Sequence, residues 1–253
     1  MIPANKTINM LYNVLYDQGF FKYKHSMYRC AGQGLLQVVD PVGPKSIVEE
    51  NNYAYENTVL FRVYSLYGNI PWHLGIGNAP IGVPATIDSH CLLRDKSLSF
   101  SGTTKAIEIM IRHGVPFFNE ISNHSQLVNA LEDYDCLIMG QILPNDPHKI
   151  APYILSGTPN KAAEVITAIE HQNWNAYYTN IKTVPNYDAA RHKSKIETRL
   201  RPLLKTRDAI IQRNAQALRE ILEENYRVNK SLLTKLRIPV SDDCVADLDT
   251  IQI

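Results

Sequence analysis

Asp88 and His90 come closer to a metal-binding pattern than any other polar pair in this chain. They stand two positions apart in a segment that reads as a β-strand, so both side chains would lie on one face. A carboxylate and an imidazole placed in this way can supply two ligands to a metal ion. Strand ends carry the same residues for solvation alone, and no histidine stands in an HxH or HExxH spacing. The sequence therefore predicts neither a metal nor another cofactor, with Asp88 and His90 as the only metal candidates.

Motifs of nucleophilic and phosphate chemistry are missing from the chain. It contains no GxSxG turn, no Walker lysine motif and no Glu-x-Lys sequence such as metal-dependent nucleases use. Gly75-Ile76-Gly77 resembles the start of a dinucleotide-binding loop, but Pro80 replaces the third glycine. A hydrolase assembled from separate elements stays an alternative, and its catalytic residues would be unknown. The missing motifs favour a non-enzymatic protein.

Positive charge is concentrated late in the chain. Residues 186–237 carry thirteen Lys and Arg against six Asp and Glu, although the whole chain has a net charge of only +1. A basic helix here would contact phosphates without sequence preference, whereas many basic helix faces are merely solvated. Association with nucleic acid is therefore an alternative function. Its candidate contact residues are Arg191, Lys193, Arg199, Arg201 and Lys205.

Tyrosines form a second group of candidate interaction residues, with fourteen in the chain. Tyrosine covers a large contact area at a small cost in entropy, which suits recognition surfaces. We expect Tyr64 and Tyr67 to be exposed and to contribute to such a surface. They favour a protein partner.

The elements that must position these residues begin with a short helix and about six strands. Helical spacing ends at Gly19, and a Gly68-Asn69 joint predicts a hairpin with Trp72 and Leu74 in a buried row. Residues 41–57 contain two prolines and read as a long loop. The strand candidates are 20–24, 27–30, 35–40, 58–67, 70–76 and 87–94. Short connections between them favour an antiparallel sheet.

Helices dominate from residue 103 onward. Asn123 with Gln126 resembles a capping box, and Thr158-Pro159 is a cap residue followed by proline at the first helical position. Residues 103–114 and the segment after Asp146-Pro147 also read as helical. An amphipathic helix or helix pair over 194–235 contains Pro202, which predicts a helix start or a kink there. We expect it to pack on its own domain or on another chain.

The early part of the chain resembles the bacterial family called domain of unknown function 4304. The resemblance rests on the run from Gly19 to Arg29, on 35–39, on 72–76, on 92–94, and on 115–118 before a Leu-rich helix. It covers roughly half of the chain, and it implies a fold and a bacterial origin. The family has no established catalytic residues, so the resemblance implies no mechanism.

The composition, with 45% apolar and 20% charged residues, is typical of an ordinary globular protein. Four dispersed cysteines without a CxxC predict thiols rather than disulfides, and the N-terminus lacks the pattern of a signal peptide. We therefore expect a cytoplasmic protein with no membrane span.

The predicted fold is α+β: an antiparallel sheet of five or six strands with helices on one face, followed by a helical C-terminal extension. The expected divisions are an α+β domain (1–140), a helical extension (141–184), a basic helical arm (185–237) and a loose acidic tail (238–253). The leading function is a non-enzymatic protein-binding module, a toxin-neutralising or accessory subunit. Its partner would be another protein or a second copy of the chain.

Overall fold

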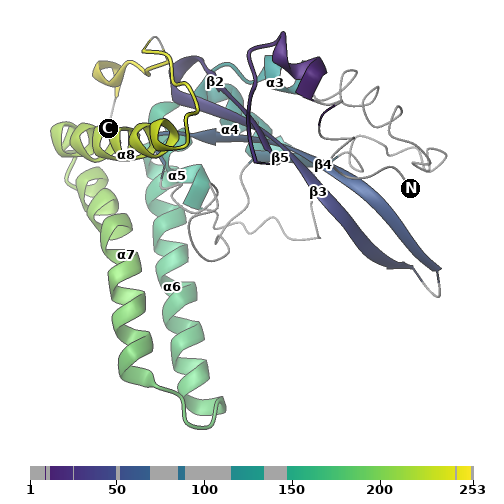
Figure 1. The fold of residues 1–253 in the computed structure, drawn as a ribbon. Coiled ribbons are helices and arrows are strands. Elements are labelled where there is room, and N and C mark those ends of the chain that lie inside the picture. Colours follow the sequence, from purple (N-terminus) through teal and green to yellow (C-terminus); the bar gives the residue numbers. More distant parts are fainter. Residues whose placement is uncertain are drawn as a thin grey trace.

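The computed structural model describes residues 9, 12–24, 26–49, 52–68, 85–88, 115–133, 147–242 and 244–251, with only the backbone for 40–49, 52–61, 85–88, 117 and 133. The strands are β1 (Phe21–Tyr23), β2 (Ser26–Ala31), β3 (Leu35–Glu49), β4 (Asn52–Ser65) and β5 (Ala85–Asp88). The helices are α3 (Val115–Glu120), α4 (His124–Asp133), α5 (Ile150–Leu155), α6 (Pro159–Thr183), α7 (Ala189–Ile211) and α8 (Ala215–Lys235). Short 3₁₀ turns cover Gly32–Gly34, Pro147–Lys149 and Leu248–Thr250. Figure 1 shows a twisted sheet from which the hairpin of α6 and α7 projects.

The described strands form one sheet in the order β1-β2-β3-β4-β5, and every neighbouring pair is antiparallel. This confirms the predicted α+β class and the antiparallel sheet. The predicted helix end is also confirmed, because Gly19 has a φ of 80° and Phe20 N–H donates to the Leu15 carbonyl.

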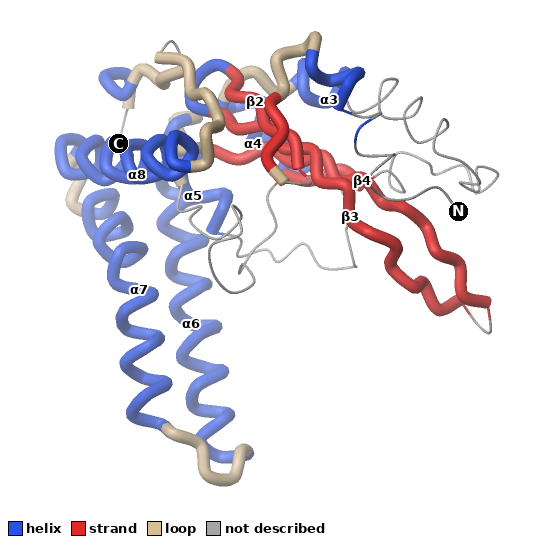
Figure 2. The backbone as a smooth tube through the Cα atoms, viewed as in Figure 1, coloured by secondary structure: helices blue, strands red, loops and turns tan. Residues whose placement is uncertain are grey.

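The prediction of a long loop over 41–57 is wrong. The β3–β4 ladder continues through this segment as far as the Glu49–Asn52 pair, and the two strands extend as a ribbon beyond the rest of the sheet (Figure 2). The register shifts between Val42 and Lys45, so Pro44 lies in an irregularity of the ladder. Such a bulge tolerates a residue that cannot donate a hydrogen bond.

Helices cover both faces of the sheet, so the prediction of one covered face is wrong. Leu35 and Val39 of β3 pack in a cluster with residues of α3, α4 and the N-terminal helical segment. The alternate residues Leu36 and Val38 face the other way and pack with Leu233 of α8. Alternation along a strand places these two sets on opposite faces. The C-terminal helix thus completes the core.

Several predicted helix boundaries are confirmed. Asn123 Oδ1 accepts a hydrogen bond from Gln126 N–H at 2.9 Å, which caps α4. The segment predicted over 194–235 is a helix pair, α7 and α8, separated at Asn214. Pro202 lies inside α7 rather than near its start. Thr158 precedes α6 as expected, but its hydroxyl donates to the Tyr153 carbonyl at 3.1 Å instead of capping the helix.

The last residues are not a loose tail. Ile238, Cys244 and Ile251 are buried, and the backbone N–H of Ala246 donates to the Tyr67 hydroxyl at 2.8 Å. Apolar residues spaced among the four aspartates anchor this segment. No observation tests the four predicted divisions as folding units, but one apolar cluster joins Tyr67 to residues as late as Ile251.

Some predictions fall outside the described residues. These are the helix over 103–114, the second strand of the Gly68-Asn69 hairpin with Trp72 and Leu74, and most of the strand over 87–94. The first strand of that hairpin is present, because β4 ends at Ser65. The Gly68 N–H then donates a hydrogen bond to the Ser65 carbonyl at 3.0 Å, which forms a turn.

Candidate docking groove between the C-terminal helices

The groove is built by three helices. Helix α6 runs away from the sheet, α7 returns antiparallel to it, and α8 lies across the end of the pair nearer the sheet (Figure 1). Asp188 Oδ1 accepts from Arg191 N–H at 3.0 Å and fixes the start of α7. Asn214 Oδ1 accepts from Ala217 N–H at 3.0 Å and fixes the start of α8. These two caps set the residues at which α7 and α8 begin.

A partly open hollow of about 530 Å³ lies where the three helices meet. Its apolar lining consists of Trp174, Leu200, Leu204, Ala209, Ala217 and Ile221. Its polar lining consists of Glu170, Glu197, Arg201, Lys205, Asp208, Gln212 and Asn214. An apolar floor with charged walls is the usual character of a binding cleft.

The apolar surface continues from the groove along α6. Tyr178 and Ile181 follow Trp174 at four and seven positions, which places the three on one helix face. The Tyr178 side chain is 56% exposed and Ile181 is 44% exposed. The Trp174 and Tyr178 rings lie 6.3 Å apart. Large exposed apolar side chains next to a groove mark a surface that a partner can cover.

Every carboxylate of the groove has a cation within ion-pair distance. Glu170 Oε2 lies 2.5 Å from Arg207 Nη1, and Asp208 Oδ1 lies 3.9 Å from Arg207 Nε. Glu197 Oε1 lies 3.9 Å from Lys193 Nζ.

The two cations that line the groove differ from its carboxylates. Arg201 and Lys205 form no ion pair or side-chain hydrogen bond with any described residue. Both are exposed. Among the charged residues that line the groove, these two cations are therefore the ones still free to pair with a partner.

The predicted basic residues all lie on α7 and are exposed. The structure brings only Arg201 and Lys205 to the groove. Lys193 is near Glu197, whereas Arg191 and Arg199 lie elsewhere on the helix surface. Partial burial lowers the pKa of Arg199 from its ordinary value.

The expectation that Tyr64 and Tyr67 are exposed is wrong, since each is only 2% exposed. Tyr67 stacks on Tyr226 with the ring centres 4.9 Å apart. Burial raises the pKa of Tyr67, while the hydrogen bond from Ala246 N–H opposes that rise. Because α8 covers this face of the sheet, neither tyrosine can meet a partner.

The metal candidates receive no support from the described part of the chain. Asp88 ends β5 opposite Leu60, and His90 lies outside the described residues. Among the described residues, no group of three or more His, Cys, Asp and Glu side chains could hold a metal ion. The pair stays a prediction from sequence.

Ser65 and His124 form the contact that most resembles a hydrolytic pair. Ser65 Oγ lies 2.9 Å from His124 Nε2. The two residues are 5% and 2% exposed, so a substrate cannot reach the hydroxyl. Burial lowers the pKa of His124 to about 3. The pair joins β4 to α4 as a structural hydrogen bond.

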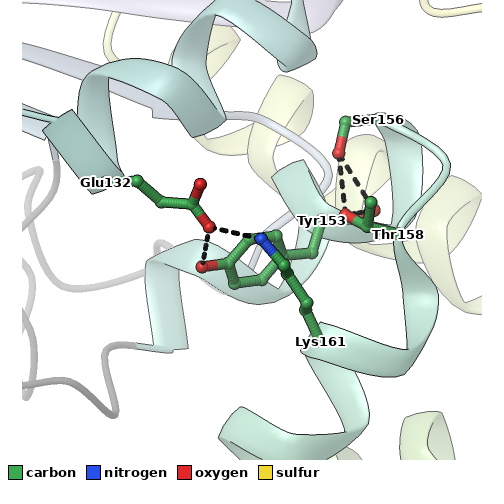
Figure 3. A network of polar contacts seen from close by, with 5 residues as sticks. All are labelled: Glu132, Tyr153, Ser156, Thr158 and Lys161. Carbon is green, nitrogen blue, oxygen red and sulfur yellow. Dashed lines mark hydrogen bonds and ion pairs between the residues drawn. The ribbon is translucent and has the colours of Figure 1, made fainter.

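A polar network holds α6 against the body (Figure 3). Glu132 Oε1 of α4 accepts from Lys161 Nζ of α6 at 2.8 Å and from the Tyr153 hydroxyl of α5 at 3.0 Å. The hydrogen bond from Lys161 is the main reason that the pKa of Glu132 is lowered. Burial, aided by Glu132, raises the pKa of Tyr153 to about 12. The network therefore links α4 and α5 to the first turn of α6.

Sequence reasoning missed the groove, although its parts were visible. The apolar repeat through Leu200 and Leu204 predicted a face that packs on protein. Nothing in the pattern indicated that Trp174 would meet that face or that three helices would leave a hollow between them.

No protein-family model, curated protein or solved structure matches the chain. The resemblance to the domain of unknown function 4304 family therefore stays a prediction from sequence. Within the described residues, the helices lack the combination of length and apolar character that crossing a membrane requires.

Proposed function

We propose that this chain is a non-enzymatic protein-binding module, a toxin-neutralising or accessory subunit, whose binding surface is the groove between α6, α7 and α8. The observation that carries the proposal is the apolar hollow that opens beside exposed Tyr178 and Ile181. A helix of a partner would place its apolar face on the half-buried side chains of Trp174, Leu204 and Ile221. Tryptophan is enriched among the residues that dominate binding energy.

The test is selection of helical peptides from a display library of amphipathic heptads. Peptides enriched on the wild-type protein should lose affinity for Leu204→Asp by about tenfold or more, because an aspartate would be desolvated under the bound helix. Trp174→Ala, which removes a groove wall without adding charge, should weaken the same peptides.

The matched control is Ile211→Asp, since Ile211 is on α7, is 66% exposed and does not line the groove. This variant should bind the selected peptides like the wild type. Circular dichroism establishes that each variant is folded. Peptides that bind Leu204→Asp and Trp174→Ala as tightly as the wild type would contradict the proposal.

Nucleic-acid association is the second candidate, favoured by the exposure of all five predicted cations on α7. Phosphate contacts would retain the protein on DNA or heparin and weaken steeply with salt. Substituting Arg199, Arg201 and Lys205 with alanine would then abolish retention. Retention of the wild type at physiological salt and its loss in the triple variant would establish this function over peptide binding.

A further inference from the structure

We infer that the groove selects an acidic amphipathic helix of another protein. The inference rests on the proposed function and adds the chemical class of the partner. It follows from the unequal pairing of the groove's charges rather than from its apolar floor, which would accept a helix of either charge.

The charges of the groove differ in whether they already have a partner of opposite sign. Glu170 and Asp208 share Arg207, and Glu197 has Lys193 within 4.0 Å, so part of the charge of the three carboxylates is already balanced. Arg201 and Lys205 have no such partner among the described residues. A partner carboxylate would gain an ion pair at either cation, whereas a partner lysine would meet two unbalanced like charges.

The spacing of these cations matches a helical ligand. Arg201 and Lys205 are four positions apart on α7, which is about 6 Å along the axis. Glu or Asp residues four positions apart on a partner helix have the same separation. Half-buried Leu204 directly precedes Lys205, so the apolar and acidic rows of the ligand would run side by side.

The length of the ligand follows from the exposed face of α6. Trp174 and Ile181 are seven positions apart, about 10 Å along the axis. A partner helix that covers the groove and this extension needs roughly three to four turns. Its apolar residues would recur at three- and four-residue spacing, with carboxylates along one border of that stripe.

A second copy of the chain is a poorer occupant on grounds of charge. The helix that would meet the groove across a symmetric interface is α7, whose exposed Arg191, Lys195 and Arg199 are also basic. Like charges facing one another oppose such an association. A separate acidic partner is therefore the occupant we infer.

The experiment measures the affinity of three synthetic helical peptides by fluorescence anisotropy. The peptides share one leucine stripe and carry Glu, Gln or Lys at the bordering positions. The wild-type protein should bind the Glu peptide about tenfold or more tightly than the Lys peptide, and the difference should shrink with added salt. Arg201→Glu with Lys205→Glu should reverse the preference.

The matched control replaces Arg191 and Lys195 with Glu, which changes the net charge equally on the same helix but outside the groove. It should keep the preference for the Glu peptide. Equal binding of the three peptides, or an equal effect of the two charge reversals, would overturn the inference while the groove itself still binds. Failure of all three peptides to bind would count against the proposed function as well.

Discussion

His124 shows how one residue can join the sheet to a helix without any part in chemistry. It is the first residue of α4, and its ring lies 6.0 Å from that of Tyr67. Its pKa is lowered to about 3 by burial, so the folded protein holds the neutral imidazole. The sequence could not indicate this, because a histidine that begins an amphipathic helix is usually exposed to solvent.

We expect His124 to make the protein sensitive to mild acid. Its ordinary pKa of 6.5 applies to the unfolded chain, which therefore binds a proton before the folded protein does. The contribution of this group to stability is complete above about pH 6.5 and is lost as the pH falls toward 3. Between about pH 6 and pH 5 the free energy of unfolding should fall by up to about 1.4 kcal/mol per pH unit more than in His124→Gln.

Urea unfolding at several pH values measures this difference. The interval from pH 6 to pH 5 lies above the ordinary pKa values of the Glu132 and Asp242 carboxyls. Because the pKa values of both are lowered in the folded protein, these two groups affect stability only at lower pH. His171→Gln, at an exposed position, serves as the control and should keep the wild-type slope. Equal slopes for wild type and His124→Gln would show that the imidazole is not buried in its neutral form.

At the scale of elements, the ends of helices could be predicted from the sequence where the capping residue and the group that it caps are only a few positions apart. The caps at Asn123 and Gly19 depend on neighbouring residues and could be read from the sequence. The ribbon over 41–60 could not, because two prolines argued against strands and a bulge in the ladder accommodates Pro44. The prediction that Tyr64 and Tyr67 are exposed was wrong for a related reason. The alternation along a strand identifies the two faces of a sheet, but it does not indicate whether both faces are covered.

Helix α8 holds the turn that follows β4, and we expect Asn229→Ala to show it. Asn229 is 4% exposed, and its Nδ2 donates to the carbonyls of Leu66 at 2.7 Å and Gly68 at 2.8 Å. Removing the amide leaves two buried acceptors without this donor, which should lower the free energy of unfolding by about 1–3 kcal/mol. The urea midpoint measures the change, with exposed Gln216→Ala as a control on the same helix. A midpoint equal to that of the control would mean that α8 does not hold this turn.

At the scale of the whole molecule, the C-terminal helices are part of the core. The face formed by Leu36, Val38 and Tyr64 is covered by Leu233 of α8 and by Ile238. The apolar stripe of the basic helical arm predicted that the arm would pack on protein, but the stripe does not indicate which surface the arm covers. Only the fold shows that this surface is the chain's own sheet.

A chain that ends at Val184 tests this arrangement. The expected division between residues 184 and 185 would leave such a fragment folded, whereas the contacts of α8 with the sheet lead us to expect the opposite. Its exposed sheet face should bind a hydrophobic dye, and its unfolding in urea should lose cooperativity. A fragment with a cooperative transition and a wild-type near-ultraviolet circular dichroism signal would mean that the arm folds separately.

The central claim is that a partner helix binds beside Trp174, and fluorine NMR tests it most directly. Protein labelled with 5-fluorotryptophan carries two reporters, because Trp72 and Trp174 are the only tryptophans. Trp174→Phe assigns the groove resonance. We predict that the acidic amphipathic peptide shifts the Trp174 resonance to saturation, and that a DNA duplex at the same concentration leaves it unchanged. A Trp174 resonance that does not move with the peptide, or that moves with DNA instead, would contradict the account.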